Sequence, residues 1–432
     1  MKTIIEPNSS LIGEIEVPGD KSISHRAIML SALCPGEYVI DNLNLGEDVM
    51  NTLKFIQDLG TVSAVNGNRL NVQGGFSGLH APSNSIWAGN SGTLVRLGAG
   101  IATYFPQDTI FVGDNSLSKR PMKRLVEPLS QMGATINGDG KNSTLPLTVS
   151  GGRLKGITYV LPVPSAQVKS AIMFASLSAI SPTEIVETAM TRVHSEELFK
   201  LVGIDLEVSR NGNEHRIYIE PSMPQIPLVI KVPGDPSQAA FFLVGAVVSK
   251  QSTVIAKNLY IGRERTGFIS VLERMGGRVM IEKSPEGYLP VAKVEARSSK
   301  LNSVEVLPDE IPTLIDEIPI LAIAAMAAEG VSIFRSVSEL RIKESDRVES
   351  IIGLVKSFGG RANATNDDLY VTGGFDRSND PVYVDAKLDH RIAMAAAVGS
   401  VMTSRIVEID GFDGVATSYT NFLEDFKCLN KT

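Results

Sequence analysis

The sequence has few of the residues that mark several common protein classes. It contains only two cysteines, Cys34 and Cys428, which lie far apart and outside any metal-binding or redox spacing. This excludes a disulfide scaffold and favours a reducing, cytoplasmic location. The longest apolar run, Ile318 to Ala328, is much shorter than a membrane span, and the first residues show no apolar signal core. We therefore expect a cytoplasmic protein without a membrane partner.

An excess of positive charge and the common nucleotide-binding motifs are also missing. The net charge of −7 argues against a nucleic-acid partner, which normally meets a basic domain. The chain has no P-loop, and no G-x-G-x-x-G follows a predicted strand. Its five histidines never occur at metal-ligand spacing. We expect no metal and no cofactor.

What the sequence does contain is a repeated pattern. "EVPGDKSISHRAIMLSAL" from Glu16 is echoed by "KVPGDPSQAAFFLVGAV" from Lys231, and looser copies begin at Trp87, Val163 and Leu314. With a sixth copy at Leu388, the spacing is roughly seventy to eighty residues. Each copy predicts a helix that is apolar nearly all round, and such a helix must be buried on every side.

A second, amphipathic helix follows most of these apolar helices and ends at glycine. Examples are "EDVMNTLKFIQDLG" from Glu47 and "DRVESIIGLVKSFGG" from Asp346. Short strand patterns such as "DLYVTGG" from Asp368 come next. The predicted fold class is α/β, with six βαβαββ units, three in each of two domains, and with helices inside and strands outside.

The two Pro-Gly-Asp copies lie half the chain apart and predict the domain boundaries. We expect residues 21–227 to form the N-terminal domain, and residues 1–20 with 228–432 to form the C-terminal domain. Two strands near 19–21 and 228–233 would make the hinge. The cleft between the domains is the expected site, because clefts of this kind commonly bind small molecules.

Basic residues cluster at the predicted helix N-termini, although that end of a helix favours anions. This arrangement predicts a site for more than one phosphate or carboxylate. For Lys21 and Arg26 an ordinary alternative stays open, in which Ser22 or Ser24 caps the helix and both cations are solvated. The residues concerned are Lys21, Arg26, Arg96, Lys119, Arg120, Lys123, Arg124, Lys169, Arg192, Lys343, Arg347 and Arg391.

Eight short motifs then occur in a familiar order over the full length: "PGDKSISHRA", "GNSGT", "KRPM", "SAQVKSA", "PGDPSQAAFF", "IDEIP", "KESDR" and "DHRIAMA". Together they resemble the 5-enolpyruvylshikimate-3-phosphate synthases, which share the two-domain, inside-out α/β barrel of the enolpyruvyl transferase fold. The resemblance implies transfer of the enolpyruvyl group of phosphoenolpyruvate to the 5-hydroxyl of shikimate 3-phosphate. Glyphosate inhibits enzymes of this family, and the sensitivity of this chain to it stays open. We expect a monomer.

The resemblance further implies roles for individual residues. It places Asp316 as proton acceptor for the 5-hydroxyl and Glu344 as proton shuttle at C3 of phosphoenolpyruvate, with Lys21 beside it. The residues implied for shikimate 3-phosphate are Lys21, Ser22, Arg26, Ser165, Ala166 (through its backbone), Gln167, Arg192, Asp316 and Lys343. Those implied for phosphoenolpyruvate are Lys21, Gly92, Arg120, Gln167, Arg347 and Arg391.

Other interpretations stay open. By residue type alone, Asp316 is an ordinary first-turn helix acid, and Glu344 and Arg347 form a surface i,i+3 pair. A lysine common near the C-terminus of the family is replaced here by Thr417 or Ser418. Two other functions remain alternatives: an enolpyruvyl transferase acting on UDP-N-acetylglucosamine, and a non-catalytic relative that binds an anionic metabolite.

Overall fold

The computed structural model describes residues 2–6, 10–189, 191–212, 214–226, 229–284 and 288–429. The chain forms two compact units. One combines Met1–Pro18 with Pro233–Thr432 and is called the split unit here; the other, Gly19–Val232, is called the continuous unit. The predicted boundary residues 227 and 228 lie outside the described residues. The hinge stays a prediction.

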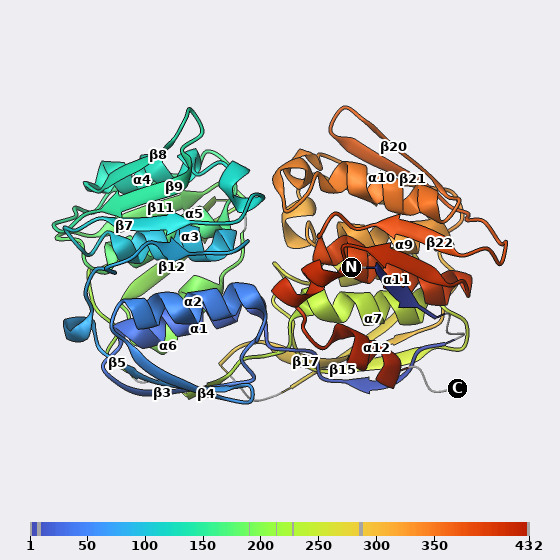
Figure 1. Cartoon of the computed structure of the whole chain (residues 1–432), viewed down its shortest axis with the longest axis horizontal. Coiled ribbons are helices and arrows are strands. Elements are labelled where there is room, and N and C mark those ends of the chain that lie inside the picture. The colour runs from blue at the N-terminus through green and yellow to red at the C-terminus, as the bar shows by residue number, and fades with distance from the viewer. Residues whose placement is uncertain are drawn as a thin grey trace. The chain divides into compact units, whose positions relative to one another are not determined.

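The continuous unit holds three four-stranded sheets around paired helices (Figure 1). Its helices are α1 (Lys21–Leu33), α2 (Glu47–Asp58), α3 (Gly92–Ala102), α4 (Lys123–Met132), α5 (Ala166–Ser176) and α6 (His194–Leu201). Its strands are β3 (Gly36–Asp41), β4 (Val62–Asn66), β5 (Arg69–Gly74), β6 (Ile86–Trp87), β7 (Thr109–Val112), β8 (Thr135–Asp139), β9 (Thr144–Ser150), β10 (Thr158–Val160), β11 (Thr183–Glu187), β12 (Leu206–Asn211), β13 (Glu214–Ile219) and β14 (Val229–Lys231).

The split unit repeats this plan with two four-stranded sheets and one three-stranded sheet among its described residues. Its helices are α7 (Pro236–Val248), α8 (Gly267–Arg274), α9 (Ile318–Ala327), α10 (Arg347–Ser357), α11 (His390–Thr403) and α12 (Phe422–Cys428). Its strands are β1 (Lys2–Ile5), β2 (Ile12–Ile15), β15 (Thr253–Tyr260), β16 (Arg278–Lys283), β17 (Val291–Arg297), β18 (Glu305–Val306), β19 (Val331–Phe334), β20 (Arg361–Thr365), β21 (Asp368–Thr372), β22 (Val382–Asp385) and β23 (Val407–Asp410).

The sheets share one topology. In the sheet β10-β11-β13-β12, the first pair is parallel and the other two pairs are antiparallel. The same order recurs in the other four-stranded sheets, for example β18-β19-β21-β20. Three of the sheets, such as β10-β11-β13-β12, come from one continuous copy of the sequence repeat, whereas the other three include a strand from a distant part of the chain: β14, β2 or β1. The predicted mixed α/β architecture with six repeated units is confirmed.

Burial of the apolar helices is confirmed as well. In α7 the residues from Pro236 to Val247 are all buried, and in α9 those from Ile318 to Met326 are all buried. Figure 1 shows α7, α9 and α11 stacked inside the split unit, with strands around them. The amphipathic α2 instead buries only one face, through residues such as Val49, Leu53 and Ile56.

The Pro-Gly-Asp turns set the starts of α1 and α7. Asp20 caps α1 by accepting a hydrogen bond from the backbone N–H of Ile23 at 2.8 Å, and Asp235 caps α7 in the same way through Ser237 at 2.9 Å. Capping of α1 by Ser22 or Ser24 is therefore wrong. Gly19 is required before the cap, because an added Cβ would lie 1.9 Å from the carbonyl oxygen of Asn42.

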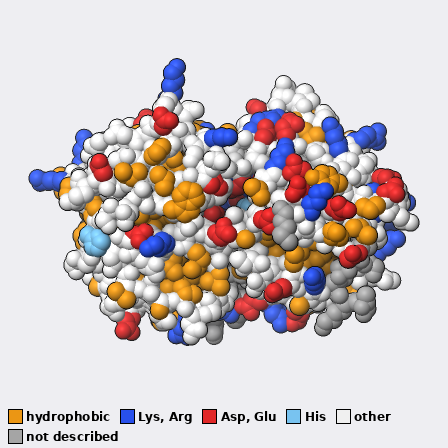
Figure 2. All heavy atoms as spheres, in the orientation of Figure 1, with side chains coloured by type: hydrophobic (Ala, Val, Ile, Leu, Met, Phe, Trp, Pro, Cys, Tyr) orange, Lys and Arg blue, Asp and Glu red, His pale blue; other side chains and the backbone are white. Residues whose placement is uncertain are grey.

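No helix among the described residues is long and apolar enough to cross a membrane. On the face drawn in Figure 2, basic and acidic side chains are intermingled, as a chain with a net charge of −7 would have them. Because opposite charges are interspersed on this face, it does not attract anions strongly. The cations that could bind anions are the partly buried side chains at helix starts.

Candidate functional site

The start of α1 gathers four of the predicted residues in the continuous unit. Arg26 is buried and donates from Nε to Ser195 Oγ at 2.7 Å, and from Nη2 to Ser170 Oγ at 2.7 Å. Arg192 donates to Ser22 Oγ at 3.3 Å, so the loop before α6 reaches the first turn of α1. Solvation of Arg26 is thus excluded, because hydroxyl groups hold its guanidinium in place.

Lys21 lies at the first helical position of α1, where Asp48 of α2 forms an ion pair with it. Asp48 is buried in the first turn of its own helix. The ammonium is therefore held at the N-terminal end of α1 and stays partly accessible, with 18% of its side chain exposed. This position suits contact with an anion.

A second group meets at the start of α3. An added Cβ at Gly92 would lie 2.7 Å from Nη1 of Arg96 and 3.4 Å from Nη1 of Arg120. Arg96 donates to Oε1 of Gln167 at 2.6 Å, and Gln167 donates in turn to Thr93 at 2.9 Å. The absence of a side chain at Gly92 thus leaves room for two guanidinium groups at one helix N-terminus.

Helix α5 joins the two groups. Ser165 caps it through the backbone N–H of Val168 at 3.4 Å. Ser170, one turn further on, accepts from Arg26 and donates to the carbonyl oxygen of Ala166 at 2.6 Å. The structure therefore brings together, within the continuous unit, the predicted residues Lys21, Ser22, Arg26, Gly92, Arg120, Ser165, Ala166, Gln167 and Arg192.

The starts of α9, α10 and α11 meet in the split unit around Arg347. Its side chain is 1% exposed, and Nε donates to Oδ2 of Asp389 at 2.8 Å. Its other nitrogens lie 2.5 Å from Oε2 of Glu344 and 3.2 Å from Oδ1 of Asp316. Glu344 and Arg347 are therefore not a surface pair, since the arginine is buried among three carboxylates.

Asp316 is the point where the cations of this unit converge. Its Oδ1 also lies 3.5 Å from Nζ of Lys343, and its Oδ2 lies 3.9 Å from Nη2 of Arg391. Arg391 donates to the backbone carbonyl of Asp316 at 3.0 Å. The structure therefore brings Asp316, Lys343, Glu344, Arg347 and Arg391 into one cluster within the split unit. Asp316 is therefore more than an acid at a helix start, because three cationic side chains lie near its carboxylate.

Burial and charge shift the proton affinities of this cluster in opposite directions. Burial alone would raise the pKa of Asp389, but the Arg347 guanidinium outweighs it and holds the pKa below its ordinary value. Burial would lower the pKa of Arg347, but the charges of Asp389, Glu344 and Asp316 raise it. Burial raises the pKa of Glu317, and the nearby charge of Arg391 does not cancel this. The Arg347–Asp389 pair is therefore permanently charged at neutral pH.

Several residues of these clusters were not assigned a role from the sequence. Asp389 lies in the "DHR" motif, whose position before an apolar helix marks it as a cap, but its pairing with Arg347 depends on packing. Ser170 and Ser195 hold Arg26 without any sequence pattern that would single them out. Lys169 was expected among the anion-binding cations. It is instead completely buried and paired with two carboxylates, so that expectation is wrong.

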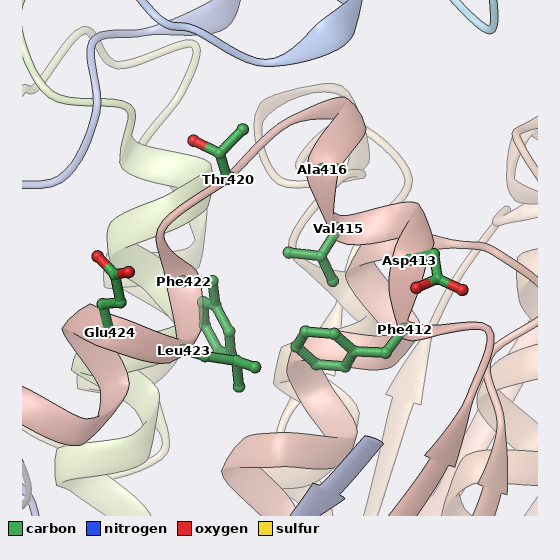
Figure 3. Close-up of a pocket in the computed structure, with 8 residues that line it drawn as sticks. All are labelled: Phe412, Asp413, Val415, Ala416, Thr420, Phe422, Leu423 and Glu424. Atoms are coloured by element: carbon green, nitrogen blue, oxygen red, sulfur yellow. The ribbon is translucent and has the colours of Figure 1, made fainter. Parts of the chain in front are cut away.

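Two other features do not provide a site for these anions. A hollow of about 290 Å³ in the split unit is lined by side chains that include Phe412, Val415, Phe422 and Leu423 (Figure 3). None of the predicted residues lines it, and a lining of apolar side chains with the acidic Asp413 and Glu424 does not suit phosphate. Among the residues that the structure describes, no group of three or more His, Cys, Asp or Glu side chains could hold a metal. The two charged clusters, one in each unit, are therefore the candidate binding regions.

Comparison with solved structures defines the class of protein. The chain matches the enolpyruvyl transferase NikO from Streptomyces tendae with a TM-score of 0.76, at 15% identity and over 99% of this chain and 96% of that one. It matches an EPSP synthase from Acinetobacter baumannii with a TM-score of 0.85, at 36% identity and over 100% of this chain and 98% of that one. The chain thus has the two-domain enolpyruvyl transferase fold.

Sequence comparison narrows the class. The model of the EPSP synthase (3-phosphoshikimate 1-carboxyvinyltransferase) family matches residues 5–426. Curated 3-phosphoshikimate 1-carboxyvinyltransferases from Lactococcus lactis and from Bacillus cereus strain G9842 are each 38% identical to this chain. The match covers 98% of both chains in the first case, and 100% of this chain and 99% of the relative in the second. The protein belongs to the EPSP synthase family of transferases.

Proposed function

We propose that the chain transfers the enolpyruvyl group of phosphoenolpyruvate to the 5-hydroxyl of shikimate 3-phosphate, giving 5-enolpyruvylshikimate 3-phosphate and inorganic phosphate. The observation that carries this proposal is the Asp316 cluster. A partly exposed carboxylate lies 3.5 Å from an ammonium and 3.2 Å from a guanidinium, and a second carboxylate, Glu344, lies beside the same guanidinium. The two carboxylates can transfer protons, and the cations around them can bind anions.

The chemistry divides between these two carboxylates. Asp316 takes the proton of the 5-hydroxyl as that oxygen adds to C2 of phosphoenolpyruvate, and Glu344 delivers a proton to C3. The resulting tetrahedral adduct then loses phosphate. Its C3 returns one proton to Glu344, and the carbon–carbon double bond re-forms. One proton is taken from the hydroxyl in total, and it leaves with the phosphate.

We assign the two substrates to residues of both units. Lys21, Ser22, Arg26, Gln167 and Arg192 bind shikimate 3-phosphate, together with Ser165 and the backbone of Ala166. Their helix starts offer N–H groups and partial positive charge, to which a phosphate binds readily. Phosphoenolpyruvate is bound by Lys21, Gly92, Arg120, Gln167, Arg347 and Arg391. Asp316 and Lys343 complete the contacts to the shikimate ring.

Phosphate release measured with each substrate alone and with both together tests the function. We expect release only when phosphoenolpyruvate and shikimate 3-phosphate are both present, and a loss of about 100-fold or more in turnover for Asp316→Asn. The matched control is Asp367→Asn, an exposed aspartate of the same unit, which should leave turnover unchanged.

The alternatives make different predictions in that assay. Release of phosphate with UDP-N-acetylglucosamine in place of shikimate 3-phosphate would identify the other enolpyruvyl transferase. Binding of both substrates without any release would identify a non-catalytic relative. Either result would overturn the proposal. We also propose that the enzyme is cytoplasmic and monomeric. Size-exclusion chromatography with light scattering would test the monomeric state.

A further inference from the structure

A buried ionic cluster in the continuous unit lies directly behind the residues proposed to bind shikimate 3-phosphate. Lys169 of α5 has no exposed surface, and its Nζ lies 2.9 Å from Oε2 of Glu187 and 2.6 Å from Oε1 of Glu196. Glu187 ends β11 and Glu196 lies in the first turn of α6, and both are almost fully buried. One ammonium thus joins three elements of the unit.

Lys169 stays charged at neutral pH. Burial alone would lower the pKa of Lys169, but the charges of Glu196 and Glu187 outweigh it and the pKa is raised. His215 is the register partner of Glu187 on β13, and its own pKa is lowered by burial. That imidazole therefore adds no charge at neutral pH, and Lys169 supplies the positive charge between the two carboxylates.

Such a cluster needs a reason beyond stability. Taking ions out of water costs several kcal/mol for each ion, and apolar side chains of similar volume often stabilise a protein as well or better. The best-attested use of a buried ionic group is to fix the register of the elements that it joins, through contacts that are directional. The function of Lys169 therefore follows from the elements that it joins, which are α5, β11 and α6.

Each partner of Lys169 lies close to one of the two arginines of the candidate site, Arg192 or Arg26. Glu187 accepts a hydrogen bond from Thr191 Oγ1 at 2.5 Å, next to Arg192, whose guanidinium contacts Ser22. Glu196 follows Ser195, whose hydroxyl accepts from Nε of Arg26 at 2.7 Å. Lys169 itself precedes Ser170, which accepts from the other end of the same guanidinium.

We propose that Lys169, Glu187 and Glu196 form a positioning trio that sets Arg26 and Arg192 for shikimate 3-phosphate. None of the three contacts a substrate. They fix the distance between α5, the end of β11 and the start of α6, and so fix the spacing of the two guanidinium groups. This inference rests on the proposed function, since it needs shikimate 3-phosphate as the ligand of these arginines.

The primary test is Lys169→Met, which keeps an unbranched side chain close in length to the lysine methylene stem and removes the charge. We expect the KM for shikimate 3-phosphate to rise about tenfold, the equivalent of one weakened charge-assisted contact. The kcat and the KM for phosphoenolpyruvate at saturating shikimate 3-phosphate should stay within about twofold, because the second substrate meets other arginines. The control is Lys200→Met, an exposed lysine on α6, which should change neither KM.

A purely structural role would give a different result. Loss of folded protein lowers the apparent kcat and leaves both KM values unchanged. Because Lys169→Met leaves two buried carboxylates without their cation, it could fail to fold. The triple variant Lys169→Met, Glu187→Gln, Glu196→Gln avoids this, since no charge remains in the cluster. We expect it to fold and still to show the raised KM for shikimate 3-phosphate.

The outcomes separate this inference from the proposed function. A triple variant with the KM of the unmodified enzyme for shikimate 3-phosphate would show that the trio positions nothing and only stabilises the fold. An unmodified enzyme that releases no phosphate with the two substrates would remove the proposed function itself. In that case, unchanged calorimetric binding of shikimate 3-phosphate to the triple variant would still overturn the trio.

Discussion

The carboxylate of Asp316 lies among three cationic side chains, at 3.5 Å from Lys343, 3.2 Å from Arg347 and 3.9 Å from Arg391. These cations are not equivalent. Arg347 is buried and tied to Asp389, whereas Lys343 and Arg391 keep part of their side chains exposed. We infer that Arg347 fixes the geometry of the carboxylates around it in addition to binding phosphoenolpyruvate, and that Lys343 and Arg391 are more accessible to incoming anions.

At the scale of single residues, Arg391→Ala should weaken the binding of phosphoenolpyruvate more than the binding of shikimate 3-phosphate. A charge-assisted hydrogen bond contributes roughly 1.5–3 kcal/mol, or about ten- to a hundredfold in affinity. Steady-state kinetics with each substrate varied in turn would measure the two KM values. Lys356→Ala, an exposed cation on α10, is the control. Equal weakening of both substrates would mean that Arg391 supports the fold and does not select a substrate.

Glu344→Gln keeps the shape of the side chain and removes its ionisable group. If Glu344 carries the proton to and from C3, turnover should fall by ~10²-fold or more while both substrates still bind. Calorimetry of substrate binding beside the phosphate-release assay would separate the two effects, with the exposed Glu349→Gln as control. Near-normal turnover would remove Glu344 from the mechanism and leave Lys21 as the proton carrier.

At the scale of elements, helix α1 carries a buried histidine between two site cations. His25 has no exposed surface, and its Nδ1 lies 2.6 Å from Oγ1 of Thr52 on α2. Its Nε2 has no hydrogen-bond partner among the described residues. Burial lowers the pKa of His25 well below 6.5, and the charges of Lys21 and Arg26 lower it further. The imidazole is therefore neutral in the folded chain, and the packing of α1 on α2 depends on that state.

This burial predicts a pH dependence of stability. As pH falls through about 6.5, the unfolded chain binds a proton at His25 that the folded chain does not, so folding is disfavoured. The free energy of unfolding should drop by up to about 1.4 kcal/mol per pH unit from this group alone. Urea unfolding of the unmodified protein and of His25→Gln, at pH values between 8 and 5, would measure it.

We expect the difference in unfolding free energy between the unmodified protein and His25→Gln to shrink as the pH is lowered. His80→Gln, at an exposed histidine of the same unit, is the matched control. A difference that stays constant from pH 8 to pH 5 would contradict the assignment, since His25 would then titrate alike in the folded and unfolded chains.

At the scale of the whole molecule, the proposed binding residues are divided between the two compact units, which the chain joins at Pro18–Gly19 and at Val232–Pro233. One reaction needs both sets of residues, and each set carries several cations. We predict that shikimate 3-phosphate begins closure by cancelling part of their repulsion, and that phosphoenolpyruvate or glyphosate binds well only afterwards.

Small-angle scattering with and without shikimate 3-phosphate measures this closure. The radius of gyration should decrease on addition of shikimate 3-phosphate, and phosphoenolpyruvate should bind weakly to the free enzyme. The variant Arg26→Ala should need more shikimate 3-phosphate for the same change. An unchanged radius of gyration, together with tight phosphoenolpyruvate binding to the free enzyme, would contradict the hinge.

The sequence by itself determined the repeat, the inside-out architecture and the family. Helices such as α9 are apolar all round, and that property allows only a fully buried position. The Pro-Gly-Asp turns likewise predicted that an apolar helix follows each of them, although the cap itself, Asp20 in α1, was not predicted. These features depend on neighbours in the chain, so they can be read from it directly.

Only the tertiary structure decided which cations face a ligand and which are buried. Lys169 and Arg26 occur in similar contexts at helix starts, but Lys169 is paired with two carboxylates that lie 18 and 27 residues further along the chain, whereas hydroxyl groups hold Arg26. The pairing of Arg347 with Asp389 spans 42 residues. Such contacts depend on how separate helices pack, and no local pattern encodes that packing.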